Sequence, residues 1–248
     1  MMQPAPSEWK ETYTVKVYEA DNLGRAGIVP LFDYFQDIAW CHYSRVEAAR
    51  GPFLSKSQIW AMTRVEVHLE RHALWKEEVE LETWSRGIEK LTAYRDFIIR
   101  DKKGDKIGAG TATWVVLDLE TKKIQNLSGI SEKWPSKPET YSLNKNAEKV
   151  APPKGALYSE SFKVSYSDMD VNQHVNSGRY IQWMTDDFGR EFLEKNTVSA
   201  IKVNYAGEAM PGDLLVTGRE DKGNGLWLVH LIRKDNSKEV CRAEIQWR

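Results

Sequence analysis

The sequence predicts an α+β fold in which the 248-residue chain repeats one structural plan twice. Each half has a short strand, a long amphipathic helix and then several strands with alternating apolar residues. A proline-rich segment separates the halves, and their helices align at a constant offset in residue number. Each half is therefore predicted to form an antiparallel sheet with one long helix.

In the first half, a strand is expected over residues 12–18, and a helix begins near Pro30. Proline suits a first helical position because its missing N–H would have no partner there. Apolar spacing predicts one buried helix face, made of Leu31, Tyr34, Phe35, Ile38 and His42. Alternation predicts four later strands, at residues 65–69, 79–83, 91–100 and 107–119.

The second half follows the same plan. A strand is expected over residues 158–166, followed by one helix over 177–194. The buried face of this helix is predicted to hold Tyr180, Ile181, Met184, Phe188 and Phe192. Four strands are expected after it, at residues 199–205, 214–219, 226–234 and 240–247.

The two helices register at an offset of 149, which pairs Phe35 with Met184. After the helices the offset falls to 138, where Val65 meets Val203. The extra residues of the first half are expected in the loop 51–58. This register indicates an internal duplication, and the alternative is a chance alignment of two helix–strand units.

Four of the nine prolines lie between the halves: Pro135, Pro138, Pro152 and Pro153. Such a segment cannot join a central strand, so it is expected to run over the surface. The predicted organisation is an N-terminal domain over 1–135, a linker over 136–157 and a C-terminal domain over 158–248.

Composition excludes several classes of protein. Thirty-five Lys and Arg residues nearly balance 36 Asp and Glu, so no overall positive field would attract nucleic acid. No apolar run reaches the roughly 18–20 residues of a membrane span. The two cysteines cannot form a disulfide framework, and the first residues lack a targeting pattern. A cytoplasmic globular protein without nucleic-acid or membrane partners is expected.

The densest polar cluster opens the second half, where Asp170, Asn172 and His174 alternate just before the helix. The alternation would place the three side chains on one side of the turn, near the unpaired N–H groups of the helix start. At the offset of 149, the first half has Asp21, Leu23 and Arg25 instead. The cluster is therefore a candidate site of chemistry in one half only. Ordinary turn and cap roles for these residues are the alternative.

Other motifs carry weaker signals. His68 and His72 lie four apart in a strand pattern, about 13 Å from each other, which is too far to share a metal ion. The Gly108-Ala-Gly110 string lacks the helix of a dinucleotide site. Cys41 and Cys241 are expected to fill buried space.

The string from Asp170 to Asn176, DVNQHVN, resembles the core motif of acyl-acyl carrier protein (ACP) thioesterases, which have a tandem (double) hotdog fold. The resemblance runs from about Trp9 to Arg248. In the first half it rests on Ile59-Trp60, Thr63-Arg64, Trp75 and Thr83-Trp84.

Carried over by position, the resemblance implies catalytic roles for Asp170, Asn172, His174 and Glu208. Plant members of the family have a cysteine directly after the glutamate, whereas this chain has Ala209, so a cysteine mechanism cannot operate at this position. The expected activity is hydrolysis of fatty acyl-ACP to free fatty acid and ACP, which ends fatty-acid synthesis. No metal ion and no organic cofactor is implied.

Thioester hydrolysis needs a polarised carbonyl and an activated nucleophile, because the leaving thiol, with a pKa near 8.5, departs readily as thiolate. Glu208 or Asp170 would activate water, or Asp170 would attack directly. His174 would bind the substrate or shuttle a proton, and Asn172 would orient its neighbours. Backbone N–H groups near Val175 and Asn176 are candidates for the oxyanion site.

The resemblance also implies that the N-terminal half holds the acyl chain. Because ACP is acidic, a basic docking patch is expected, with Arg64, Arg71 and Lys76 or the linker lysines as candidates. Alternatives are an acyl-CoA thioesterase, a hotdog hydratase and a non-catalytic acyl-binding module. Gln173 and the four-residue gap between Asp170 and His174 depart from the hydratase motif. The sequence leaves the oligomeric state open, and a homodimer is one of the alternatives.

Overall fold

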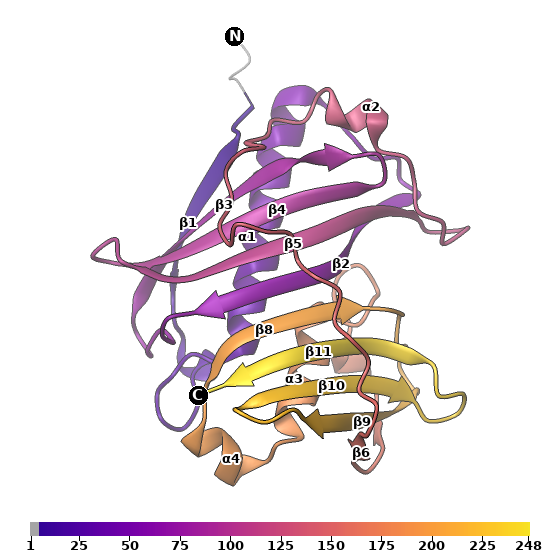
Figure 1. Ribbon diagram of the computed structural model, residues 1–248. Helices are drawn as coiled ribbons and strands as arrows, with labels where there is room; N and C mark the ends of the chain where they lie inside the picture. Colours follow the sequence, from indigo (N-terminus) through magenta and orange to yellow (C-terminus); the bar gives the residue numbers. More distant parts are fainter. Residues whose placement is uncertain (1–4) are drawn as a thin grey trace. The chain divides into compact units, whose positions relative to one another are not determined.

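The computed structural model describes residues 5–248, and its contacts divide the chain into two compact units (Figure 1). The N-terminal unit comprises the chain up to Ala26 together with Asp33–Ala147. The C-terminal unit comprises Gly27–Phe32 and Glu148–Arg248. Each unit has one antiparallel sheet and a helical layer, as the sequence predicts.

The sheet of the N-terminal unit has the order β1-β3-β4-β5-β2, and all neighbouring strands are antiparallel. Helix α1 (Ile28–Arg50) covers one face, where Phe35 stacks on Phe97 with ring centroids 4.3 Å apart. A Cβ atom at Gly110 would lie 2.8 Å from the Phe35 ring, so the glycine lets the helix approach the sheet. The strands are β1 (Glu8–Thr14), β2 (Gln58–Leu69), β3 (Glu78–Glu89), β4 (Thr92–Asp101) and β5 (Lys106–Asp118), with short helices η1 (Val17–Glu19) and α2 (Ser128–Ser131).

The sheet of the C-terminal unit has the order β8-β11-β10-β9-β6, and β7 also pairs with β9. Helix α3 (Ser177–Asp186) buries Ile181 and Met184 completely against it. The other elements are β6 (Leu157–Tyr158), β7 (Phe162–Lys163), η2 (Tyr166–Asp168), α4 (Arg190–Lys195), β8 (Val198–Tyr205), β9 (Leu214–Asp221), β10 (Leu226–Arg233) and β11 (Glu239–Trp247).

The prediction of one helix over 177–194 was wrong in its middle. Helix α3 ends at Asp186 and α4 begins at Arg190, and between them Gly189 has a φ of 76°. This left-handed conformation interrupts the helical backbone and suits glycine. The first half has no such break, since α1 continues for 23 residues.

The first strand of each half was also placed too far along the chain. β1 ends at Thr14, and the predicted strand over 158–166 is reduced to β6 and β7. The pairing ends with the next residue in register, where Val15 N–H donates to the Glu77 carbonyl and Val164 N–H to the Asp213 carbonyl. A 3-10 turn follows at the same place in both halves, η1 and η2.

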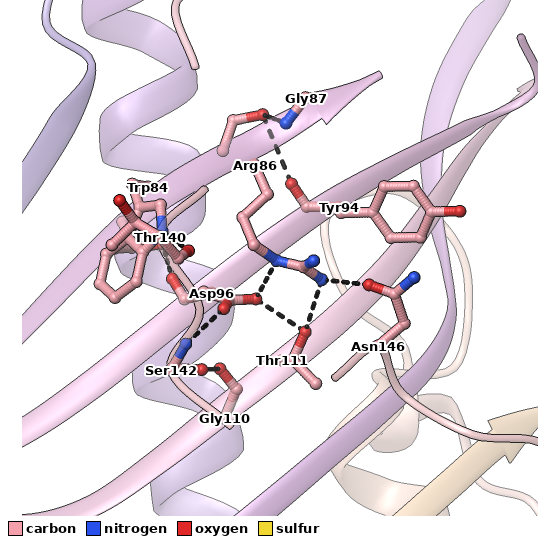
Figure 2. A network of polar contacts seen from close by, with 12 residues as sticks. Trp84, Arg86, Gly87, Tyr94, Asp96, Gly110, Thr111, Thr140, Ser142 and Asn146 are labelled. Atoms are coloured by element: carbon pink, nitrogen blue, oxygen red, sulfur yellow. Dashed lines mark hydrogen bonds and ion pairs between the residues drawn. The ribbon is translucent and has the colours of Figure 1, made fainter. Parts of the chain in front are cut away.

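The segment after α2 packs on the face of the N-terminal sheet through a buried polar network (Figure 2). Arg86 Nε donates to Asp96 Oδ1 at 2.9 Å, and both side chains are almost fully buried. The Ser142 N–H donates to Asp96 Oδ2 at 2.7 Å, and Asn146 Oδ1 accepts from Arg86 Nη2 at 2.5 Å. Ser142 and Asn146, which were predicted to lie in the linker over 136–157, therefore belong to the N-terminal unit, which extends to Ala147.

Within residues 5–248, no helix is long and apolar enough to cross a membrane.

Candidate functional site

The candidate site is built on the turn that joins η2 to α3. Asp170 closes this turn: its N–H donates to the His174 carbonyl at 2.8 Å, and its Oδ1 accepts the N–H of Asn172 at 2.8 Å and that of His174 at 3.5 Å. Gln173 at the tip has a φ of 63°. A carboxylate that accepts nearby backbone N–H groups is a common device for a tight turn. The turn therefore fixes the backbone on which Asn172 and His174 stand.

The first half contains the same turn with different side chains. Asp21 N–H donates to the Arg25 carbonyl at 2.8 Å, and Asp21 Oδ1 accepts the N–H groups of Leu23 and Arg25 at 2.9 Å each. Gly24 at its tip has a φ of 75°. Both turns thus share their aspartate and backbone, whereas Asn172 and His174 occur in the second half alone.

His174 and Glu208 lie side by side in the C-terminal unit. His174 Nε2 is 3.1 Å from Glu208 Oε1, and the two side chains are 31% and 36% exposed. Glu208 lies three residues after the end of β8 and 34 residues after His174 in the sequence. The position of β8 in the sheet places Glu208 next to the turn. A carboxylate and an imidazole at hydrogen-bond distance, reachable by solvent, can accept and pass on a proton.

The first turn of α3 supplies the cap and the backbone donors. Asn176 caps the helix, because its Oδ1 accepts the Gly178 N–H at 2.7 Å. Its own N–H donates to the Asp168 carbonyl at 2.9 Å, so this group is already engaged and is not a free oxyanion donor. Val175 is buried opposite Met169 in an isolated bridge. Of the two predicted oxyanion donors, Val175 is the one that stays a candidate.

Comparison with known protein families gives the chain two matches. Residues 6–129 match the acyl-ACP thioesterase N-terminal domain, and residues 153–248 match the acyl-ACP thioesterase C-terminal domain. The chain belongs to the acyl-ACP thioesterase family. The predicted family membership is therefore confirmed.

Individual relatives agree with this family. The chain is 24% identical to an oleoyl-ACP thioesterase of Arabidopsis thaliana, over 97% of this chain and 76% of the relative. The crystal structure of an acyl-ACP thioesterase from Bacteroides thetaiotaomicron superposes with a TM-score of 0.87 at 21% identity, covering 98% of both chains. The 12:0-ACP thioesterase of Umbellularia californica also gives 0.87 at 21% identity, covering 99% of both. The double hotdog fold of this family is confirmed.

Three residues of this thioesterase-family site were missed from the sequence. The Tyr180 hydroxyl accepts the Ala209 N–H at 2.9 Å, and the Tyr205 hydroxyl donates to the Ser177 carbonyl at 3.1 Å. Arg233 of β10 donates from Nη2 to the Glu208 carbonyl and lies 2.8 Å from Asp213 through Nη1. Tyr180 was counted among the apolar core residues, because helical spacing does not report what a hydroxyl binds. The signal in the sequence was the difference between the halves at this position, where the first half has Leu31 and the second half has a tyrosine.

Other candidate residues lie in different surroundings. Burial raises the pKa of the Cys241 thiol well above its usual value, and the side chain is fully buried as expected. Cys41 is only partly buried. Among residues 5–248, no group of His, Cys, Asp and Glu is arranged to hold a metal ion.

Proposed function

We propose that this protein hydrolyses the thioester of fatty acyl-ACP, releasing the free fatty acid and ACP. The observation that carries the proposal is the contact between His174 Nε2 and Glu208 Oε1. The equivalent turn of the first half has Leu23 and Arg25 at the positions of Asn172 and His174. Membership of the acyl-ACP thioesterase family supports this substrate class.

In the proposed mechanism, Glu208 accepts a proton from water while His174 orients the carboxylate and relays the proton. The water oxygen attacks the thioester carbon, and its electrons move onto the carbonyl oxygen. The Val175 N–H and the N-terminal end of α3 stabilise the resulting oxyanion. The intermediate then expels the carrier thiolate, which takes up the proton released from water.

Asp170 has a different role in this proposal. Its Oδ1 is occupied by backbone N–H groups of Asn172 and His174, as Oδ1 of Asp21 is by those of Leu23 and Arg25. We therefore assign Asp170 to positioning of the turn, and Glu208 to activation of water. Asn172, whose side chain is exposed, is assigned to orienting the substrate.

The N-terminal unit is proposed to hold the acyl chain against the apolar face of α1. Among the basic candidates for carrier docking, Arg71 is already paired with Glu77 and Asp101. Lys76 is exposed, with its ammonium 4.3 Å from the centre of the Trp75 ring. We therefore propose Lys76 as a docking residue for the acidic carrier, and Arg64 and the linker lysines stay candidates.

The test is kcat/KM for one long acyl chain presented on ACP and, separately, on coenzyme A, with His174→Ala as the blank. A strong preference for the ACP thioester supports the proposal. Comparable rates, or a preference for coenzyme A, would transfer the same site to coenzyme A thioester turnover. Absence of hydrolysis on both carriers would overturn the assignment. Sedimentation of the same sample distinguishes a monomer from a homodimer.

A further inference from the structure

Two tyrosines connect the segment that carries His174 with the segment that carries Glu208, and they do so reciprocally. Tyr180 stands on α3, and its hydroxyl accepts the N–H of Ala209, the residue after Glu208. Tyr205 stands at the end of β8, and its hydroxyl donates to the carbonyl of Ser177, the first residue of α3. Each element thus sends one hydroxyl to the backbone of the other.

Ring packing and burial restrict the movement of the groups that form these hydrogen bonds. The Tyr180 and Tyr205 rings meet edge to face, with centroids 5.9 Å apart and planes at 80°. Tyr180 is 4% exposed and Ala209 is fully buried, so water does not compete for the Ala209 N–H. Burial also raises the pKa of the Tyr180 hydroxyl above its ordinary value.

Arg233 closes the loop from its other side. Its guanidinium donates to the carbonyl of Glu208 and is held by the Asp213 carboxylate. The peptide group between Glu208 and Ala209 is therefore held on both sides: its carbonyl accepts from Arg233, and its N–H donates to Tyr180. The side chain that contacts His174 belongs to the residue on the carbonyl side of this peptide.

The first half provides an internal comparison. Its counterpart of the Glu208 loop also closes on an acid, since Leu74 N–H donates to Glu77 as Met210 N–H donates to Asp213. That acid is likewise paired with an arginine, Arg71. Tyr180 matches Leu31 at the helix offset, and Tyr205 matches Leu69 at the offset that pairs Leu74 with Met210; neither leucine has a hydroxyl. The loop closure is common to both halves, whereas the tyrosine pair accompanies the residues of the proposed site.

We infer that Tyr180 and Tyr205 are positioning residues that hold Glu208 within hydrogen-bond reach of His174, and that Arg233 secures the same loop. The inference rests on the proposed function for its effect on catalysis. Its structural part, coupling between the start of α3 and the loop after β8, is independent of any substrate. Displacement of a catalytic group by about 1 Å typically costs about 10²-fold in rate.

The test uses Tyr180→Phe, Tyr205→Phe and the double variant of the full chain, since phenylalanine keeps the ring and removes the hydroxyl. We expect each single variant to lower kcat about 10-fold and the double variant about 10²-fold, with KM changed less than about threefold. The second readout is hydrogen exchange. Tyr180→Phe is expected to speed exchange in the loop 206–210, where the Ala209 N–H loses its acceptor, and Tyr205→Phe to speed it in residues 175–178.

Thr185→Val is the matched control. Thr185 is a buried hydroxyl on the same helix, and its bond stays within that helix, to the Ile181 carbonyl at 2.9 Å. We expect near wild-type kcat and exchange changes confined to α3. The inference is overturned if both tyrosine variants keep kcat within twofold of wild type, or if exchange changes only in the substituted element. If the wild type hydrolyses neither acyl carrier, the proposed function fails, and the exchange pattern still decides whether the tyrosines couple the two segments.

Discussion

Asp21 and Asp170 make the same backbone hydrogen bonds at equivalent points of the two halves. Each donates its N–H to the carbonyl four residues later at 2.8 Å, and each accepts two N–H groups on Oδ1. Only the second turn carries Asn172 and His174. An aspartate kept in both copies is explained by the turn, so it is weak evidence for a chemical role of Asp170 itself.

This relationship predicts a small effect on activity for one substitution of Asp170 and a larger effect for another. Asp170→Asn retains an oxygen that can accept both N–H groups, and we expect kcat within about fivefold of wild type. Asp170→Ala removes the acceptor; we expect a loss of about 1 kcal/mol in stability, typical of a lost cap, and a larger fall in kcat. Steady-state kinetics with thermal unfolding measures both. Equal and severe losses of activity in both variants would mean that the charge of Asp170 takes part in the reaction.

The contact between His174 and Glu208 predicts strongly coupled kinetic effects. Glu208→Gln keeps the shape but cannot accept a proton, and His174→Gln cannot relay one. We expect each to lower kcat by about 10²–10⁴-fold, with KM changed little, as for the loss of a general base. The double variant should be little worse than either single variant, because both residues serve one proton transfer. Additive losses would show that the two residues act in separate steps.

The buried Arg86–Asp96 pair predicts a large effect on folding of the N-terminal unit. Asp96→Asn leaves the Arg86 guanidinium buried without its counter-charge, which typically costs about 3–5 kcal/mol of unfolding free energy. Urea unfolding monitored by tryptophan fluorescence measures this loss. Glu194→Gln is the matched control, because it removes an ion pair whose arginine, Arg190, is 83% exposed, and it should shift the midpoint far less.

His42 predicts a pH dependence of stability. Burial, together with the nearby Arg95 guanidinium, lowers the pKa of His42 to about 4. The unfolded chain binds this proton near pH 6.5, so between about pH 6.5 and pH 4 the unfolded state holds more protons than the native state. The contribution of His42 to the unfolding free energy is therefore fully present above pH 6.5. It is lost as the pH falls toward 4, and the loss is about 3 kcal/mol at most.

His42→Gln isolates that contribution. Glutamine can accept from Arg95 and donate to the Pro6 carbonyl, the two partners of the imidazole, and it does not titrate. Unfolding free energies of wild type and variant at pH 7, 5 and 4 should diverge, with the wild type losing more as the pH falls. Parallel pH curves would contradict the neutral buried imidazole.

Much of the fold was predictable because its signals are local. The alternation at residues 65–69 and 79–83 lies within β2 and β3, and the apolar spacing from Leu31 to His42 lies within α1. The break before α4 was not predictable from spacing, since Phe188 and Phe192 continue the apolar periodicity through it. There a single glycine in a left-handed conformation outweighs the pattern.

The site was predictable in its residues more than in its geometry. The DVNQHVN string identifies the turn, but the approach of Glu208 to His174 depends on how β8 is placed in the sheet. The tyrosine hydroxyls depend on the same non-local register. The engagement of the Asn176 N–H by Asp168 was also hidden, because nothing in the sequence reports which carbonyl a helix-start N–H meets.

The left-handed residues at the tips of the two turns, Gly24 and Gln173, have a consequence for the history of the chain. The left-handed backbone angle occurs at both tips although one residue is glycine and the other is glutamine, so the shape of the turn is separable from the side chains that it presents. After a duplication, one copy can drift in its side chains as long as its backbone is preserved. The first turn shows the same scaffold without the side chains of the proposed site.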